Sequence, residues 1–157
     1  LSNAITLISG AGANVVAARG PDGTLLVDGG SRERSADLVK LALRETAARL
    51  ADLPATTLVQ SSVIEYQSGA GIGWHRDRPQ FGIVVGFSLL APCRFRLRRA
   101  VKDGWDRAPL DLAPRSAYVL AGEAREAWQH SIPPLDALRY SVTFRTLSPS
   151  GARLVQR

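Results

Sequence analysis

The sequence is poor in cysteine and histidine and has no long uninterrupted apolar run. Its single cysteine, Cys93, excludes an intrachain disulfide and fits a reducing compartment. The longest apolar stretch, from Phe81 to Cys93, is interrupted by glycines, Ser88 and Pro92 and is too short to span a bilayer. No basic-then-apolar signal pattern opens the chain, so we expect a cytoplasmic protein with no membrane partner.

Length and composition are those of one modest domain. The chain has 157 residues, and its hydrophobic fraction of 45% is ordinary for a protein with one core. Basic residues are unevenly spread: residues 1–57 carry six basic and six acidic side chains, whereas residues 91–147 carry ten basic and six acidic. Charge of this kind bears on association rather than on fold. We expect the protein to be a monomer.

The chain has only two histidines, His75 in the run GWHRD and His130 in the run WQHSI. His75 and Asp77 are two residues apart, so on an extended strand their side chains point to the same face. If His130 joins them, two imidazoles and one carboxylate form the ligand set of a non-haem Fe(II) oxygenase. Such a triplet also arises by chance, and a lone histidine is commonly a core or surface residue.

Residues 138–145, LRYSVTFR, alternate strictly between polar and apolar side chains. This is the pattern of a half-buried strand, but its inner face is unusually polar. Two guanidinium groups on one side of a strand need an anion, because buried charges are paired or costly. A planar dicarboxylate suits them, since arginine can hold a carboxylate with two parallel hydrogen bonds. The polar face comprises Arg139, Ser141, Thr143 and Arg145.

Together these segments resemble the AlkB branch of the 2-oxoglutarate and Fe(II)-dependent dioxygenases, over roughly residues 58–147. The last segment is the most specific, because the arginine pair, the tyrosine after the first arginine and the Thr-Phe before the second recur in that family. The matching pieces are Tyr66, residues 69–77, Ser88 with Leu89, residues 130–135 and residues 139–145.

The resemblance implies a catalytic iron site with 2-oxoglutarate and O2 as cosubstrates. It implies that the Fe(II) ligands and catalytic residues are His75, Asp77 and His130. It also implies that Arg139 clamps the distal carboxylate of 2-oxoglutarate. The other cosubstrate residues that it implies are Arg145, near the opposite end, and the hydroxyl of Tyr66.

The substrate implied by the resemblance is alkylated nucleic acid, with the base flipped out or already single-stranded. Alternation from residue 94 to 98 predicts a basic stripe beside the oxidising pocket, which suits a phosphate backbone. A solvated strand face explains the stripe equally well. Trp74 and Trp128 flank the iron ligands and either stack on a base or belong to the core. The candidate substrate residues are Trp74, Arg78, Arg94, Arg96 and Arg98.

Two alternatives to nucleobase dealkylation remain open. The same oxidative chemistry could act on a protein side chain or a small molecule, or the chain could be a truncated, non-catalytic domain. Arg78, directly after the aspartate, departs from the acidic or polar residues of the nucleobase-repair members. The sequence does not choose between DNA and RNA or identify the alkyl lesion.

Short apolar runs separated by Gly, Pro and Asp turns predict a mainly β (α+β) fold, a double-stranded β-helix or jelly roll. Turns are expected at residues 102–104 and 114–115. The eight expected strands are residues 58–66, 73–75, 84–89, 94–99, 109–112, 116–120, 128–132 and 139–145.

The N-terminal part predicts a separate extension over residues 1–30, before a dioxygenase domain over residues 31–157. Residues 14–19 and 24–28 flank a Gly-Pro-Asp-Gly turn and predict a β-hairpin. Residues 31–50 predict one packing helix, with Ser31 or Ser35 as N-cap.

The same extension resembles the opening hairpin of a metallo-β-lactamase fold. Since no histidine precedes His75, the metal motif of that fold is absent, and we assign the segment no hydrolase chemistry. In AlkB-type enzymes a segment before the jelly roll supplies the lid that grips the nucleotide. This region does not resemble that lid, so altered or missing substrate recognition is expected.

Overall fold

The structure is a computed structural model that describes residues 5–8, 15–20, 23–27 and 35–155. The chain forms two compact units, Leu1–Thr46 and Ala47–Arg157. Their division falls inside helix α1 (Ser35–Leu50), whereas the domain division expected after residue 30 stays a prediction. No helix in the described ranges is long and apolar enough to cross a membrane.

The first unit contains a three-stranded antiparallel sheet with the order β1-β2-β3. The predicted hairpin is confirmed, because β2 (Val15–Gly20) pairs with β3 (Gly23–Val27). Strand β1 (Ile5–Ile8) pairs with β2 and was not predicted as a separate strand. The predicted helix is α1, described from Ser35 onward, and the alternative N-cap Ser31 lies outside the described residues.

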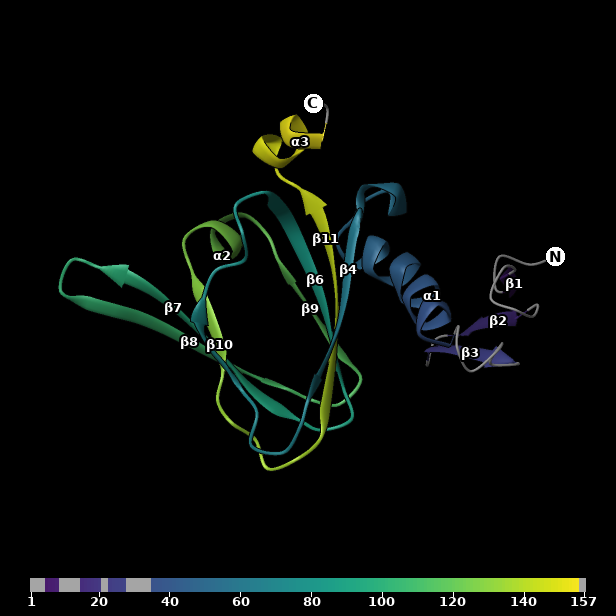
Figure 1. The fold of residues 1–157 in the computed structure, drawn as a ribbon, viewed down its shortest axis with the longest axis horizontal. Helices are drawn as coiled ribbons and strands as arrows, with labels where there is room; N and C mark the ends of the chain where they lie inside the picture. The colour runs from purple at the N-terminus through teal and green to yellow at the C-terminus, as the bar shows by residue number, and fades with distance from the viewer. Residues whose placement is uncertain (1–4, 9–14, 21–22, 28–34, 156–157) are drawn as a thin grey trace. The chain divides into compact units, whose positions relative to one another are not determined.

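The second unit is built from two four-stranded antiparallel sheets, with the orders β4-β11-β6-β9 and β5-β10-β7-β8 (Figure 1). Sheet neighbours that are far apart in sequence give the Greek-key connections of a jelly roll, so the predicted fold class is confirmed. The strands are β4 (Gln60–Tyr66), β5 (Ile72–His75), β6 (Phe81–Leu89), β7 (Cys93–Val101), β8 (Gly104–Leu112), β9 (Ser116–Leu120), β10 (Gln129–Ile132) and β11 (Arg139–Leu147).

All eight predicted strands are present, and their ends account for most of the differences. Strand β8 begins at Gly104 rather than at residue 109, because it pairs with β7 from the Val101–Gly104 turn onward. Its side chains are mostly exposed at the edge of the sheet, so hydrophobic alternation could not reveal its full length. Three short helices were not predicted: η2 (Ala55–Thr57), α2 (Gly122–Glu126) and α3 (Pro149–Val155).

Strand β11 corrects the expectation of a half-buried strand. It lies between β4 and β6, and both of its faces are buried through the middle. Val142 and Phe144 are each 1% exposed, while Ser141 and Thr143 on the opposite face are also buried. A central strand covered on both sides must satisfy its polar side chains inside the protein.

The hydrophobic core lies between the two sheets. Strands β6 and β9 contribute Val84 and Leu120 from one sheet, and the other sheet supplies the remaining members. Their alternation explains the placement: on β7, Phe95 and Leu97 point inward while the arginines between them point outward. The buried members are Val84, Cys93, Phe95, Leu97, Leu112, Leu120 and Ile132.

The chain just before β5 approaches the end of β10 very closely at Gly71. A β-carbon added there would lie 2.7 Å from the backbone oxygen of Ile132 and 2.7 Å from the nitrogen of Pro134. At Gly73, which lies within β5, an added β-carbon would meet nothing within 4 Å. Only the first glycine is therefore required by packing.

Gly71→Ala should lower the free energy of unfolding by about 1–3 kcal/mol, because the methyl group forces the β5 and β10 backbones apart. Gly73→Ala is the matched control and should leave stability unchanged or slightly raised. Chemical denaturation of both variants measures the difference. Equal stability of the two would contradict the close approach.

Candidate metal centre

The two histidines lie directly opposite each other on neighbouring antiparallel strands. His75 on β5 is the register partner of His130 on β10, so the two side chains share the inner face of the sheet. Their ring centroids are 4.2 Å apart. His130 is 8% exposed and stacks on Phe95 at 5.3 Å. A pair that is remote in sequence is thus fixed by strand pairing.

Asp77 completes a cluster just beyond the end of β5. Its Oδ1 atom lies 3.8 Å from Nε2 of His75 and 3.9 Å from Nε2 of His130. One ion bound at about 2.1 Å to two ligand atoms requires that they be no more than about 4.2 Å apart. Both separations satisfy this, and all three ligand atoms lie within 4.8 Å of one another. The structure therefore brings together the three ligands expected from the sequence.

The protonation states of these residues suit a metal. Burial lowers the pKa of His130 to about 4, helped by the neighbouring His75, so its imidazole is neutral at pH 7. Burial by itself would raise the pKa of Asp77, but its hydrogen bond and ion pair with Arg145 outweigh burial and lower that pKa. Metal ligands must be deprotonated, and both groups meet this requirement.

The His75 ring is oriented by its own strand. Its Nδ1 atom lies 2.9 Å from the backbone oxygen of Gly73. Only a protonated Nδ1 can donate to a carbonyl oxygen, and that tautomer leaves the Nε2 lone pair directed at the cluster. Such a contact is typical of a metal-binding histidine.

Arg145 lies against the carboxylate of Asp77. Its Nε donates to Oδ2 of Asp77 at 2.7 Å, and its Nη1 donates to Gln60 and Thr143, each at 2.8 Å. The resemblance implied that Arg145 lies near the cosubstrate, and the structure shows it hydrogen-bonded to Asp77, one of the expected metal ligands. Gln60 was missed, since only its register pairing with Arg145 brings the two together.

Arg139 is buried without an anion. It is 1% exposed, and its Nε and Nη2 donate to Oγ of Ser88 at 3.2 and 3.1 Å. Its Nη1 is the one buried side-chain nitrogen or oxygen of the described residues that lacks a hydrogen-bond partner. A buried guanidinium without a carboxylate is costly, so this position fits a carboxylate-bearing ligand.

Tyr66 is positioned to serve the same ligand. It is the register partner of Arg139, whose guanidinium carbon lies 5.2 Å from the centre of the tyrosine ring. Burial raises the pKa of the Tyr66 hydroxyl, so it stays a hydrogen-bond donor at neutral pH. Tyr66 lines an internal cavity that also includes His75, Asp77, His130, Ser141, Thr143 and Arg145.

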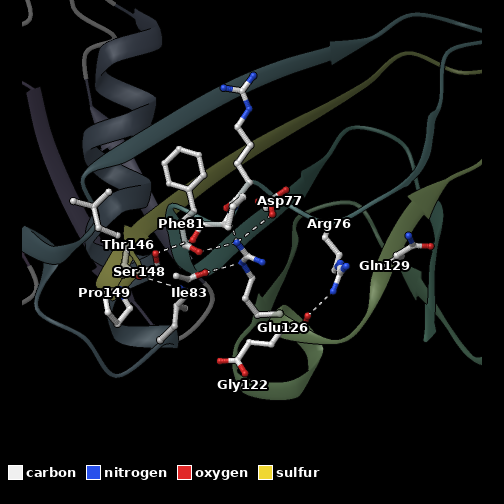
Figure 2. Close-up of a pocket in the computed structure, with 15 residues that line it drawn as sticks. Arg76, Asp77, Phe81, Ile83, Gly122, Glu126, Gln129, Thr146, Ser148 and Pro149 are labelled. Atoms are coloured by element: carbon white, nitrogen blue, oxygen red, sulfur yellow. Dashed lines mark hydrogen bonds between the residues drawn. The ribbon is translucent and has the colours of Figure 1, made fainter. Parts of the chain in front are cut away.

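A second and much larger cavity, about 1000 Å³, has Asp77 in common with the first as a lining residue. Figure 2 shows the residues that line the larger cavity. Its wall comes from the segment after β5, the start of β6, helix α2 and the end of β11. Arg76 and Arg78 give it positive charge, and Phe81 and Ile83 give it apolar surface. A cavity of this size and mixed lining suits a substrate rather than the cosubstrate alone.

Arg125 of helix α2 holds the segment that carries Asp77. Its Nη2 donates to the backbone oxygens of Arg78 at 2.8 Å, Phe81 at 2.7 Å and Asp77 at 3.3 Å. Its Nε donates to the backbone oxygen of Gly82 at 2.9 Å. The sequence gave no signal for this role, because the contacts are to backbone atoms more than 40 positions away.

The basic stripe lies on the outer face of its sheet. His130 and Leu97 are register partners on the inner face, so Arg96 and Arg98 point to the opposite face. Of the candidate substrate residues, Arg78 lines the large cavity, and Trp74, Arg94, Arg96 and Arg98 line neither cavity. The substrate role of these residues stays a prediction.

Trp128, the other tryptophan beside a metal ligand, packs against the hydrophobic core. The guanidinium carbon of Arg99 lies 5.0 Å from the centre of its ring. These contacts favour the core interpretation over base stacking.

Comparison with known proteins identifies the family of the chain and several similar proteins. A family model described as the 2OG-Fe(II) oxygenase superfamily matches residues 31–145. An "Alkylated DNA repair protein ALKBH8 homolog" from Arabidopsis thaliana is 34% identical over 93 residues, covering 48% of this chain and 27% of that protein. "Uncharacterized protein L905" of Acanthamoeba polyphaga mimivirus is 30% identical over 101 residues, covering 56% and 48%. The chain thus spans less than half the length of these relatives.

Among solved structures, a Pseudomonas putida prolyl-4-hydroxylase is similar with a TM-score of 0.49 and 17% identity. The match covers 78% of this chain and 70% of that one.

Arg139→Met should weaken 2-oxoglutarate binding by about 30-fold or more, because losing the partner of a buried charge costs about 2–5 kcal/mol. The free energy of unfolding without ligand should not fall, since the variant removes a buried, incompletely bonded guanidinium. Titration of the Mn(II)-loaded protein with 2-oxoglutarate, alongside chemical denaturation, measures both. Lowered stability with unchanged 2-oxoglutarate affinity would make Arg139 a purely structural residue.

Arg125→Met should weaken divalent-metal binding by roughly 10–100-fold, the usual effect of losing a residue that orients a ligand. Co(II) titration followed by visible absorption measures the affinity directly. Arg153→Met, on the exposed surface of α3, is the control and should bind Co(II) normally. If Arg125→Met binds Co(II) as tightly as the unmodified protein, the segment does not depend on α2.

Proposed function

The chain belongs to the 2OG-Fe(II) oxygenase superfamily, and we propose that it removes alkyl groups oxidatively from N-alkylated nucleobases. The observation that carries the proposal is the convergence of His75, Asp77 and His130 at a cavity also lined by Tyr66, the strand partner of a buried arginine without an anion. The first feature fits iron, and the second fits the distal carboxylate of 2-oxoglutarate.

His75, Asp77 and His130, which all line the first cavity, would hold Fe(II) there. When bound, iron with 2-oxoglutarate supplies the oxidising chemistry, in which O2 is consumed and the cosubstrate is converted to succinate and CO2. Arg145 keeps Asp77 ionised and fixes its orientation through the 2.7 Å hydrogen bond. The protein's task is to provide this geometry and to exclude water.

Arg139 and Tyr66 would hold the cosubstrate at its far end. The orphaned Nη1 of Arg139 supplies a donor for a carboxylate oxygen, and the protonated Tyr66 hydroxyl supplies another. Ser88 fixes the guanidinium through two hydrogen bonds, so little freedom is lost when the ligand binds.

The substrate assignment is supported by the large cavity and by the name of the plant relative. Arg76 and Arg78 offer positive charge for phosphates beside Asp77, and the cavity is large enough for an unstacked base. Hydroxylation of an N-methyl group gives a hemiaminal, whose C–N bond breaks as the hydroxyl loses its proton, so that formaldehyde and the bare nitrogen are released. The proton goes to an exocyclic nitrogen or, from a cationic ring-methylated base, to water. One O2 and one 2-oxoglutarate are consumed for each methyl group removed.

The test compares single-stranded oligonucleotides that carry one N-methylated adenine or cytosine with unmethylated copies of the same sequence. The Fe(II)-loaded protein should release formaldehyde and succinate in equal amounts only with the methylated strands. His75→Ala and Asp77→Ala should retain the fold and lose both products, because these ligands are not part of the hydrophobic core.

Succinate without formaldehyde, at a rate independent of methylation, would contradict dealkylation of nucleobases while leaving the iron chemistry intact. Succinate release stimulated instead by a peptide or a small molecule would assign the oxidative chemistry to that substrate.

A further inference from the structure

The outer face of the sheet β5-β10-β7-β8 carries a cluster of arginines and tryptophans that the metal centre does not use. The guanidinium carbon of Arg98 lies 4.3 Å from the ring centre of Trp74 and 4.1 Å from that of Trp105. Arg96 lies 5.0 Å from Trp74. We call this cluster the arginine–tryptophan face, and its members are Trp74, Arg96, Arg98, Trp105 and Arg107.

Strand pairing places these side chains on one surface. Arg98 on β7 is the register partner of Arg107 on β8, and Ala100 is the partner of Trp105. Residues 96, 98 and 100 alternate with the inward-facing Leu97, so they and their partners point outward. Ser131 and Gln129 of β10 accept hydrogen bonds from Arg96 and Arg98 and orient both guanidinium groups.

The positive charge on this face is not neutralised within the described residues. Arg94 pairs with Asp111, and Arg99 pairs with Asp106 and Glu123. Arg96, Arg98 and Arg107 have no carboxylate partner in the described part of the chain. Like charges directly opposite on neighbouring strands, as at Arg98 and Arg107, are destabilising, and an external anion would offset that repulsion.

The aromatic members favour one kind of anion. Trp105 is 40% exposed, so part of its surface is open for stacking. A base with a free face can stack on an indole or a guanidinium plane, with about 1–3 kcal/mol per base. Bases in a duplex are already stacked on each other, and an acidic peptide has no rings to offer. Arginines without a carboxylate partner, next to an exposed tryptophan, therefore favour binding of a single-stranded nucleic acid.

The face is also linked to the large cavity, because Gln129, which accepts a hydrogen bond from Arg98, is one of the residues that line that cavity. Trp74 is the residue before the metal ligand His75 on β5, which is the edge strand of its sheet. Arg76, two residues after Trp74, lines the large cavity and donates to the backbone oxygen of Glu126. A single-stranded nucleic acid bound on the face can thus pass around the β5 edge toward the metal centre.

We propose that the arginine–tryptophan face binds the backbone and unstacked bases of single-stranded nucleic acid and guides it to the cavity beside Asp77. The guiding role rests on the proposed dealkylase function, whereas binding itself does not. The contact is sequence-independent, because phosphates and stacked bases carry no base-specific hydrogen bonds.

The test measures binding of an unmethylated, fluorescently labelled single strand by anisotropy over a range of salt, with no turnover required. Arg98→Gln/Arg107→Gln should reduce the slope of log affinity against log salt by roughly 1.4, that is about 0.7 for each lost phosphate contact. At 0.1 M salt the same change corresponds to roughly 25-fold weaker binding. Trp105→Ala should weaken binding by about 5-fold or more while leaving the slope unchanged.

The control Arg115→Gln/Arg153→Gln removes the same net charge from exposed positions outside this sheet and should bind as the unmodified protein does. Thermal unfolding checks that each variant folds, and Arg107→Gln alone, at an exposed position, provides a milder variant with half the change in slope. Equal losses in the control would show a general charge effect and overturn the proposal.

Tighter binding of a duplex or of polyglutamate than of the single strand would overturn the choice of partner. Unchanged affinity and slope in the double variant would show that the arginine–tryptophan face does not bind nucleic acid, even if methylated oligonucleotides release formaldehyde. Conversely, weaker binding by the double variant without formaldehyde release from any methylated strand would support the face and reject the dealkylase function.

Discussion

The cross-strand pairing of His75 with His130 is the interaction on which the rest of the site depends. Neither histidine lies near the other in sequence, and one slipped position in the β5–β10 register would turn one imidazole to the outer face. Gly71 makes this register possible, because its lack of a side chain lets the start of β5 approach the end of β10. Once the pair is set, two further residues of chain bring Asp77 to the same ion position.

Strand β11 places charge inside the protein in two different ways. Arg145 is matched to Asp77 and to the polar groups of β4, so its charge is neutralised where the metal ligand needs it. Arg139 hydrogen-bonds to the hydroxyl of Ser88 and lies over the ring of Tyr66, but it has no carboxylate partner in the described residues and its Nη1 has no hydrogen-bond acceptor there. Arg145 has protein partners for its charge without a ligand, whereas Arg139 does not. This asymmetry favours a binding role for Arg139 and an orienting role for Arg145.

The strands could be predicted from alternation, and the pairing of His75 with Asp77 from their spacing, because both are short, local patterns. His130 is remote in sequence, and only the family resemblance joined it to the other two expected ligands. The sequence could not predict contacts set by strand register or by backbone acceptors. The bond from Arg145 to Gln60 requires the β4–β11 pairing, and the clamp made by Arg125 involves only carbonyl oxygens, which leave no trace in side-chain patterns. The basic stripe was identified correctly as one strand face, but alternation alone could not say which face meets the cavity.

The difference between the inner and outer faces of a strand separates the roles of its side chains. On β7, each inward side chain such as Phe95 or Leu97 serves the core behind His130, and each outward arginine is left to the outer surface. On β5 the same alternation separates Trp74 from His75 by one residue. The residue that would contact a nucleic acid on the outer face, Trp74, and the residue that would bind the metal on the inner face, His75, are therefore adjacent in sequence although they lie on opposite faces of the sheet. Because β5 is an edge strand, no further strand of the sheet lies beyond it, and Arg76, two residues after Trp74, lines the large cavity on that side.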